Sequence, residues 1–538
     1  SGRNAVDTRS TLFRTGAIVR VLTATLALRM AEQGTLDLDS DITGLTSLID
    51  DSFGPLTLRQ LLLHTAGIDQ RRIATRARRP DELLPLADYL ARRMPDRVRP
   101  ADRLSVPSAH GYSLVGRICE LVSDRDFGLL LEQEVLTPLG MSSTTVVSSP
   151  VPNARIATGH RWMAERWTTV WPDFAQTTPA STLLTSAQDI SLWMRAVLGD
   201  GTRLLQPESV SLLLEPQFRL HESLPGRTLA LREGSSPDPP GLYLYSVENG
   251  TSAVLVLLPA RRLGLFAAFN GEIDLRSLVE ALLEPFDSPR RRREDTSDTQ
   301  LGLDFDPRGT WRDTAVSLAT PEKLLGLVRQ DRIVPAEDGA LLWRQRVFQP
   351  ESSSCFLESS SGVRLCFARG PGSRPLAMIG DLVLEKLVWY ESRPVQVFLW
   401  VTFTAVFLAA GWSRRGPPHR HEALLPEGPL APHWPLGLAR LAAALHFVFI
   451  VALVVVLAML SRGDSPNLLY EIPPYVALIL MLPLAAGVLT LAAAMGLVPV
   501  WRAGPSARGQ QLYLALLVVS LIAFLPFLWH WNLLGFRV

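Results

Sequence analysis

Lysine is almost missing from this 538-residue chain, which has 51 arginines but only two lysines, Lys323 and Lys386. Arginine has a pKa above about 12 and therefore cannot take a proton from a hydroxyl group near neutral pH. Because no lysine precedes residue 323, the sequence excludes a lysine base from everything before that position.

Cysteine is scarce too, and the three cysteines are too few for a disulfide scaffold. Cys119 lies in a predicted helix and is interpreted as a small buried apolar residue. Cys355 and Cys366 flank a predicted hairpin turn at 358–362. They either stay free or form a cross-strand disulfide, and the second outcome requires a location outside the cytoplasm.

Net charge is also small: the formal value of +1 excludes a nucleic-acid partner recruited by bulk electrostatics. Long uncharged runs are present, by contrast, in the last third of the chain. Each is about long enough to cross a hydrocarbon core of roughly 30 Å, and none contains Lys, Arg, Asp or Glu. The sequence therefore predicts a transmembrane region at 394–538, with the lipid bilayer as partner and with four helices at about 395–412, 441–460, 475–498 and 512–531.

Arginines in the connectors between these runs predict the orientation in the membrane. Connector one carries Arg414, Arg415 and Arg420, and connector three carries Arg502 and Arg508. Connector two carries only Arg462. Positive connectors stay in the cytoplasm, so the preceding modules are expected outside the cytoplasmic (inner) membrane. His446 is the ionisable residue deep in a run, and we expect it to form a helix–helix hydrogen bond.

The stretch Phe13–Ala24, FRTGAIVRVLTA, leads into a predicted helix. This helix has an apolar stripe at Ile18, Leu22, Leu26 and Met30. It resembles the nucleophile helix of serine β-lactamase-related hydrolases, F-R-x-G-S-x-x-K-x-x-T-A. This family includes class C β-lactamases, D-alanyl-D-alanine carboxypeptidases and related esterases. The position of the family's nucleophilic serine is Ala17, and that of its lysine base is Arg20. Alanine offers no nucleophile and arginine no base.

Further segments carry the same resemblance: Glu32–Asp39, Leu56–Gly67, Phe127–Met141 and Ala180–Trp193. The resemblance implies a scaffold role for His64. It also places two cleft-wall glycines at Ser181 and Thr182, which implies an altered cleft wall. Ser186 to Asp189 has the pattern of a helix start.

The family's Tyr and Asn motif falls in Leu104–Glu120, which resembles F-x-Y-S-N-x-G-Y-x-L-L-G-x-I-I-E. The tyrosine position is Pro107 and the asparagine position is Ala109, and only Ser108 is kept. A displaced reading at 112–114 also lacks the asparagine.

The third motif, K-T-G or H-x-G, should lie on a strand that closes the pocket. The paired strands Ser252–Pro259 and Leu263–Asn270 are recognisable, and counting back from Gly250 places the family's His or Lys near Leu244. No such motif is present there, and we expect a strand of fully apolar alternation that serves packing alone.

The resemblance implies an α+β fold with a serine β-lactamase/penicillin-binding-protein-like module at 1–285. Its N-terminus, with any export signal, is expected to be truncated. A linker at 286–300 follows, with Arg290–Arg293 as a solvated tether or a contact for anionic lipid. A small antiparallel β domain at 301–390 resembles the lipocalin-like domain of many relatives, with a ligand cavity or packing alone inside. Its expected strands lie at 309–312, 341–348, 355–357, 363–367 and 376–379, with a turn at 334–339.

These observations lead to a hypothesis of a catalytically inactive homologue, without metal or cofactor, that has a binding, scaffold or regulatory role outside the cytoplasm. Its partner would be an unknown peptide, small molecule or protein. The alternative is an active periplasmic serine hydrolase or peptidase that acts on peptide or amide substrates and uses another nucleophile, such as Ser108 or Ser113. A third possibility is that the membrane helices are the working part and the outer module is their receptor.

Overall fold

The computed structural model describes residues 5–49, 53–146, 155–199, 204–234, 240–286, 302–358, 362–380, 382–412, 433–461, 467–502 and 508–535. The chain divides into two compact units. The first holds residues 1–70, 75–315 and 331–386, and the second holds residues 71–74, 316–330 and 387–538. The linker arginines at 290–293 and the centre of the expected 358–362 turn lie outside the described residues.

Helix α1 (Val19–Glu32) lies at the centre of the first unit, after strand β1 (Thr11–Arg14) and the short helix η1 (Gly16–Ile18). All four residues of the expected stripe are buried, but so are residues on its other faces, and ten of the 14 residues are buried in total. A helix that is buried on most sides is surrounded by protein, which fits its place in the main core.

Helix α8 begins where the sequence predicted, and α4 begins with a cap of the same kind. In α4 (Ala109–Ser123) the hydroxyl of Ser108 accepts from the amide of Gly111, and in α8 (Ala187–Leu198) that of Ser186 accepts from the amide of Asp189. Each bond satisfies a donor that the first turn leaves free. The other helices of eight or more residues in the described part of this unit are α3 (Leu86–Arg93), α9 (Pro207–Leu214) and α10 (Arg276–Leu283).

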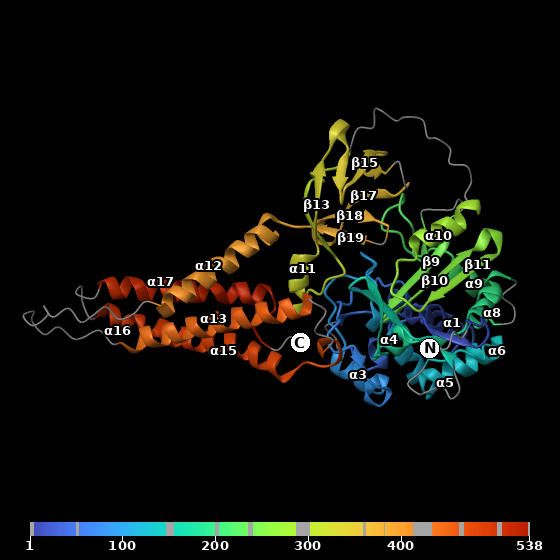
Figure 1. Cartoon of the computed structure of the whole chain (residues 1–538), viewed down its shortest axis with the longest axis horizontal. Helices are drawn as coiled ribbons and strands as arrows, with labels where there is room; N and C mark the ends of the chain where they lie inside the picture. The colour runs from blue at the N-terminus through green and yellow to red at the C-terminus, as the bar shows by residue number, and fades with distance from the viewer. Residues whose placement is uncertain are drawn as a thin grey trace, which may run out of the picture. The chain divides into compact units, whose positions relative to one another are not determined.

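The sheet of this module has the strand order β11–β10–β9–β8. The bounds are Leu263–Phe269, Thr251–Leu258, Leu242–Glu248 and Arg232–Glu233. β10 is buried at every position, because the side chains of one face pack in the main core and those of the other face pack in a second cluster with helix α10 (Figure 1). Strand β1 instead pairs with β3 (Arg155–Ile156) and β7 (Leu184–Thr185).

The small β domain is a closed barrel in which strands pair with their sequence neighbours, and the first strand also pairs with the last. The strands are β12 (Gly309–Asp313), β13 (Gln330–Pro335), β14 (Leu341–Trp343), β15 (Arg346–Pro350), β16 (Cys355–Leu357), β17 (Arg364–Arg369), β18 (Pro375–Ile379) and β19 (Leu382–Lys386). Tightly packed side chains form its core, which includes Trp311, Phe348, Phe356 and Phe367.

Two expectations for this domain were wrong, and one strand was not foreseen. The run 341–348 is two strands, because Arg344 and Gln345 turn the chain with φ of 47° and 65°. Neither residue is typical of such a turn, so the sequence did not signal it. The part of the expected 334–339 turn up to Pro335 belongs to strand β13, and β19 was not predicted at all.

Of the two outcomes expected for the barrel cysteines, free thiols or a cross-strand disulfide, the structure shows the disulfide. Cys355 and Cys366 face each other across β16 and β17 and form a disulfide.

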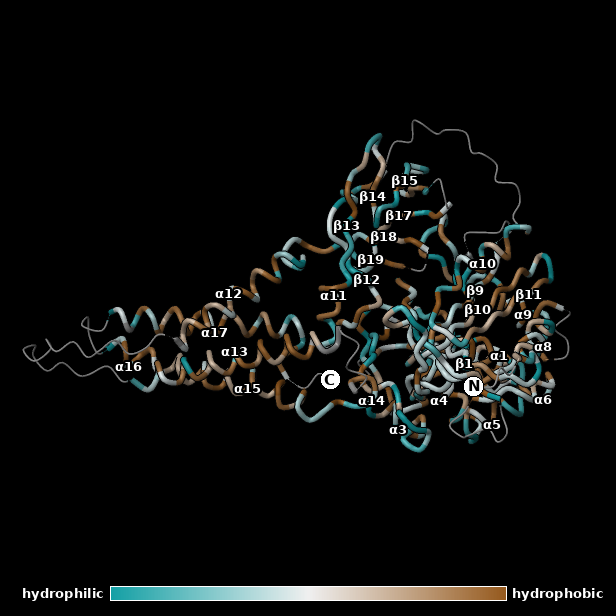
Figure 2. The backbone as a smooth tube through the Cα atoms, in the orientation of Figure 1, coloured by the Kyte–Doolittle hydropathy of each residue, from teal (hydrophilic) through white to brown (hydrophobic). Residues whose placement is uncertain are grey.

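Within the described part of the second unit, four helices are long and apolar enough to cross a membrane: Arg393–Gly411, Trp434–Val456, Pro474–Arg502 and Gln511–His530. They belong to α12 (Arg393–Trp412), α13 (Trp434–Ser461), α15 (Pro474–Met495) continued by α16 (Leu497–Arg502), and α17 (Arg508–His530). Hydrophobic colouring runs along α13, α15 and α17 in Figure 2. The α+β module, the β domain and four membrane-capable helices are therefore confirmed as the fold class.

His446 does not form the helix–helix hydrogen bond that we expected. Its side chain is fully buried, and among the described residues neither ring nitrogen has a hydrogen-bond partner. The ring instead stacks on Phe407 and meets Phe524 edge-on, with centroid distances of 5.4 and 4.9 Å.

Candidate functional site

The start of α1 is held against strand β9. Gly16 has a φ of +49°, and a Cβ there would lie 2.3 Å from the side chain of Glu248, so only glycine fits. The next residue, Ala17, donates its backbone N–H to the hydroxyl oxygen of Ser246 at 3.0 Å. The amide at the nucleophile position is therefore already satisfied within the protein.

Arg20 is bound in a way that suits packing and gives no base. Its Nε donates to the carbonyl of Ala180 at 3.1 Å, and its guanidinium lies 5.7 Å from the ring centroid of Tyr112. Burial lowers the pKa of Arg20, while Tyr112 and Glu248 act in the opposite direction. Burial also raises the pKa of the Tyr112 hydroxyl, which donates to the carbonyl oxygens of Leu62 and Leu229.

The positions of the lost Tyr and Asn lie at the start of α4. Pro107 is exposed, and its carbonyl accepts from the side chain of Gln70 at 2.6 Å. Ala109 is half-buried and packs against the main core. Ser108 caps the helix, and Ser113 donates its hydroxyl to the carbonyl of Ala109 at 3.0 Å. Both alternative nucleophiles thus have structural hydrogen bonds.

Strand β9 is not fully apolar, and this part of the sequence interpretation was wrong. Leu244 does pack against the main core. Two residues later Ser246, at the glycine position of K-T-G or H-x-G, reaches Ala17, and Glu248 follows on the same face. The polar residues at 246 and 248 continue the alternation of Leu242 and Leu244, and this was the missed signal.

Glu248 belongs to an ion-pair network that sequence analysis did not find. Arg76 in β2 (Arg76–Ala77) donates one Nη to Glu248 and the other to Asp173 at 2.8 Å. All three side chains are largely buried, with exposed fractions of 22%, 15% and 5% for Arg76, Glu248 and Asp173. Burial raises the pKa of the Glu248 carboxyl, and Arg76 opposes this rise.

A cavity of about 230 Å³ lies beside this network. Ser181 and Thr182, which replace the family's two glycines, form part of its wall. Among the described residues, the hydroxyl of Thr182 is buried without a hydrogen-bond partner. The charged and amide groups in the lining belong to Arg14, Arg76, Asp173, Glu248 and Asn249, and apolar surface comes from Ile156, Phe174, Leu183 and Leu184. The cavity can therefore bind a small amphipathic molecule, and this lining does not supply the family's serine and lysine to react with it.

His64 has a structural contact, as the resemblance implied. It is buried with a φ of 59°, and its Nδ1 accepts from the backbone N–H of Ser108 at 3.1 Å. Burial, followed by the charge of Arg20, holds its pKa well below the usual value of 6.5. The imidazole is therefore neutral and fixes the chain before α4.

We predict that His64→Asn reduces the acid sensitivity of the module. The unfolded chain protonates His64 near pH 6.5, but the folded chain does so only at lower pH, so this contribution to stability is lost as pH falls below 6.5. Asparagine keeps an acceptor and tolerates the positive φ. Between pH 7.5 and 5, the free energy of unfolding should fall less steeply in the variant than in the parent, by up to about 1.4 kcal/mol per pH unit. Equal slopes would contradict this, and His160→Asn is the half-buried control.

Comparison with known proteins places this site in a family. Residues 3–283 match the family Beta-lactamase. Penicillin-binding protein 4 of Amycolatopsis lactamdurans is 26% identical over 227 residues, which is 39% of this chain and 58% of the relative. An uncharacterised protein of Mycobacterium tuberculosis is 28% identical over 241 residues, 38% of this chain and 59% of the relative. The chain thus spans less than two thirds of the length of these relatives.

Among solved structures, SurE is similar with a TM-score of 0.51 and 23% identity, over 72% of this chain and 90% of SurE. A second structure, of SurE with D-Leu, has a TM-score of 0.50 and the same identity. At this identity the likeness concerns the fold alone. Because the family match extends over more than half of the chain and agrees with the motifs around Ala17, Pro107 and Leu244, this chain belongs to the Beta-lactamase family.

Proposed function

We propose that this protein is a membrane-anchored, catalytically inactive member of the family that binds a ligand without turnover and acts as a binding, scaffold or regulatory protein. The observation that carries the proposal is the contact between Ala17 and Ser246. The residue at the nucleophile position has no hydroxyl, and its amide already has an acceptor, so it is not free to stabilise an oxyanion.

Arg20 supports the same proposal. A base at this position would have to accept a proton, and a guanidinium that donates to the Ala180 carbonyl and lies over Tyr112 cannot do so. Pro107, Ala109 and Leu244 add no group that could replace it.

The cavity supports binding rather than mere loss of function. Its wall presents a buried Thr182 hydroxyl that has no partner among the described residues, next to charged groups and apolar surface. Clefts that combine apolar lining with a few polar groups are typical ligand sites. SurE was solved with D-Leu, so D-leucine is the first molecule to test.

The alternative is a serine hydrolase that uses Ser108 or Ser113. Their hydroxyls take part in the first turns of α4, and no lysine precedes residue 323 to serve as base. The experiment below separates the two functions directly.

We expect no covalent adduct when the detergent-purified protein is incubated with a fluorophosphonate or a penicillin and measured by intact mass. The Ala17→Ser, Arg20→Lys double variant should also stay unlabelled, because Ser246 still occupies the amide of residue 17 and Leu244 stands in place of the third motif. Adding Ser246→Gly gives a triple variant in which the amide of residue 17 is released from Ser246. This triple variant should be labelled more than the double variant.

A single stoichiometric adduct on the parent would contradict the proposal and identify the serine to pursue. Ser108→Ala and Ser113→Ala controls would then tell which hydroxyl reacts. Labelling of the double variant at position 17 would show instead that the scaffold alone supports acylation.

We propose further that the module and the barrel lie outside the cytoplasmic membrane. The support is the excess of arginine in connectors one and three, of which Arg502 and Arg508 lie among the described residues. The arginines of the other two connectors, Arg414, Arg415, Arg420 and Arg462, lie outside the described residues, so this proposal rests on sequence.

Cysteine labelling in intact cells tests the orientation. Ser465→Cys in connector two should react with a membrane-impermeant maleimide, and Ser506→Cys in connector three only after permeabilisation. Cys119 is buried and Cys355 is bonded to Cys366, so the parent should stay unlabelled. The reverse pattern would place the module in the cytoplasm.

A further inference from the structure

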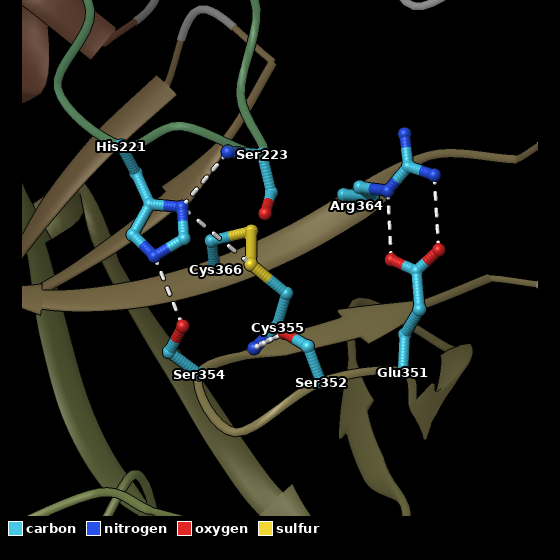
Figure 3. The surroundings of a disulfide bond; sticks show 8 residues. All are labelled: His221, Ser223, Glu351, Ser352, Ser354, Cys355, Arg364 and Cys366. Carbon is cyan, nitrogen blue, oxygen red and sulfur yellow. Dashed lines mark hydrogen bonds and ion pairs between the residues drawn. A yellow bond between two sulfur atoms is a disulfide. The ribbon is translucent and has the colours of Figure 1, made fainter. Parts of the chain in front are cut away.

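A cluster of three side chains that could together hold a metal ion lies where the segment between α9 and β8 meets the barrel (Figure 3). Cys355 on β16 and Cys366 on β17 are directly opposite each other in the register of the two strands. His221 comes from the connecting segment. The three donor atoms all lie within 4.8 Å of one another.

Hydrogen bonds fix the tautomer of His221. The backbone N–H of Ser223 donates to Nδ1 at 3.1 Å, so this nitrogen carries the lone pair. Nε2 therefore carries the proton and donates to the hydroxyl of Ser354 at 2.9 Å. Nδ1 lies 3.9 Å from the sulfur of Cys355 (Figure 3). A hydrogen bond on the far nitrogen is typical of histidines that bind metals.

The surroundings favour a soft cation and offer few competing ligands. Both cysteines are fully buried, and they pack with Leu224 and Met378 in an apolar cluster. The nearby Glu351 carboxylate is held by Arg364 through two bonds of 2.7 and 2.9 Å (Figure 3). Two sulfurs and one imidazole nitrogen are ligands that zinc prefers, whereas calcium and magnesium take oxygen.

We propose that reduction of the Cys355–Cys366 disulfide creates a binding site for one thiophilic divalent cation of the zinc type, held by both thiolates and by His221 Nδ1. A dithiol reductant supplies two electrons and two protons and leaves as its own disulfide. The cation then displaces the two thiol protons into solvent, and the Ser223 N–H gives up its acceptor. Water fills the fourth position of a tetrahedral site.

The geometry suits this exchange. Zinc bonds of about 2.3 Å to sulfur and about 2.0 Å to nitrogen place neighbouring sulfur and nitrogen ligands roughly 3.5 Å apart in a tetrahedron. The distance from Nδ1 to Cys355 Sγ is already 3.9 Å. Once the covalent bond is broken, the two sulfurs can separate to the roughly 3.8 Å that the same geometry requires. The disulfide and the metal site therefore exclude each other, and the redox state selects between them.

The test uses the full-length protein in detergent, in a Cys119→Ala background so that only the two barrel cysteines carry thiols. The sample is reduced with a phosphine, freed of reductant without oxygen, and titrated with zinc against a chromophoric chelator. We expect one zinc per chain in the reduced sample and none in the oxidised sample. Cobalt, added instead of zinc, should give the thiolate charge-transfer band of a tetrahedral site.

His221→Ala should weaken zinc binding at least about tenfold, while the disulfide still forms. His160→Ala is the matched control and should leave the affinity unchanged. Absence of zinc binding in the reduced parent would overturn the proposal. Equal affinity of His221→Ala and the parent would overturn the assignment of His221. The cobalt spectrum of the Cys119→Ala background protein gives a result that does not depend on the folding of the His221→Ala variant.

Discussion

The Arg76→Met variant should lose about 3 kcal/mol or more of stability in the β-lactamase-like module. Arg76 neutralises two carboxylates, Glu248 and Asp173, which keep exposed fractions of only 15% and 5%. Removing one partner of a buried ion pair leaves uncompensated buried charge, which costs about 3–5 kcal/mol. Thermal unfolding of the parent and the variant, followed by tryptophan fluorescence in the same detergent, measures the loss.

Two further variants test this explanation. Arg79→Met removes exposed ion pairs to Asp81 and Glu82 and should change stability by no more than about 0.5 kcal/mol. Adding Glu248→Gln to Arg76→Met should recover part of the loss, because the amide carries no charge. If Arg76→Met is as stable as Arg79→Met, the network does not stabilise the fold.

The deficit of Arg76→Met should also shrink in acid. Burial raises the pKa of the Glu248 carboxyl above its unfolded value. Such a group costs stability as pH rises from the unfolded toward the folded pKa, and the cost disappears when pH falls and the carboxyl is protonated. Without Arg76, nothing from that residue opposes the rise of the Glu248 pKa. The difference in free energy of unfolding between the single variant Arg76→Met and the double variant with Glu248→Gln should therefore narrow from pH 7 toward pH 5.

The second large effect concerns the barrel. The Cys355→Ser, Cys366→Ser double variant should lose about 3 kcal/mol, because the disulfide closes a short loop with a sequence separation of 11 and restricts the unfolded chain. A reductant should lower the unfolding temperature of the parent in the same way and leave the double variant unchanged. Measurements in the presence of a metal chelator keep zinc from compensating.

Cys119→Ala is the control for this experiment. Cys119 is buried in α4 and takes no part in the disulfide, so its variant should respond to reductant as the parent does. If the double variant and the parent unfold at the same temperature under oxidising conditions, the barrel does not depend on the covalent link.

The sequence by itself determined the features that depend on neighbouring residues. Helix caps such as Ser108 and Ser186, the apolar stripe of α1 and the four uncharged runs are local patterns, and the structure has an element at each of them. The family could be named for a related reason, since its motifs are contiguous strings. The losses at Ala17 and Arg20 were visible because the rest of each string was kept.

Only the tertiary structure decided which groups replaced the lost chemistry. Ser246 meets Ala17 across 229 positions of the chain, Arg76 meets Glu248 across 172, and His221 lies beside Cys355 across 134. No periodicity connects residues so far apart, because their contact depends on how whole strands and segments pack. The occupied amide at the nucleophile position, the cavity wall and the three-ligand cluster are therefore properties of the packed chain, and local sequence determined only the elements that carry them.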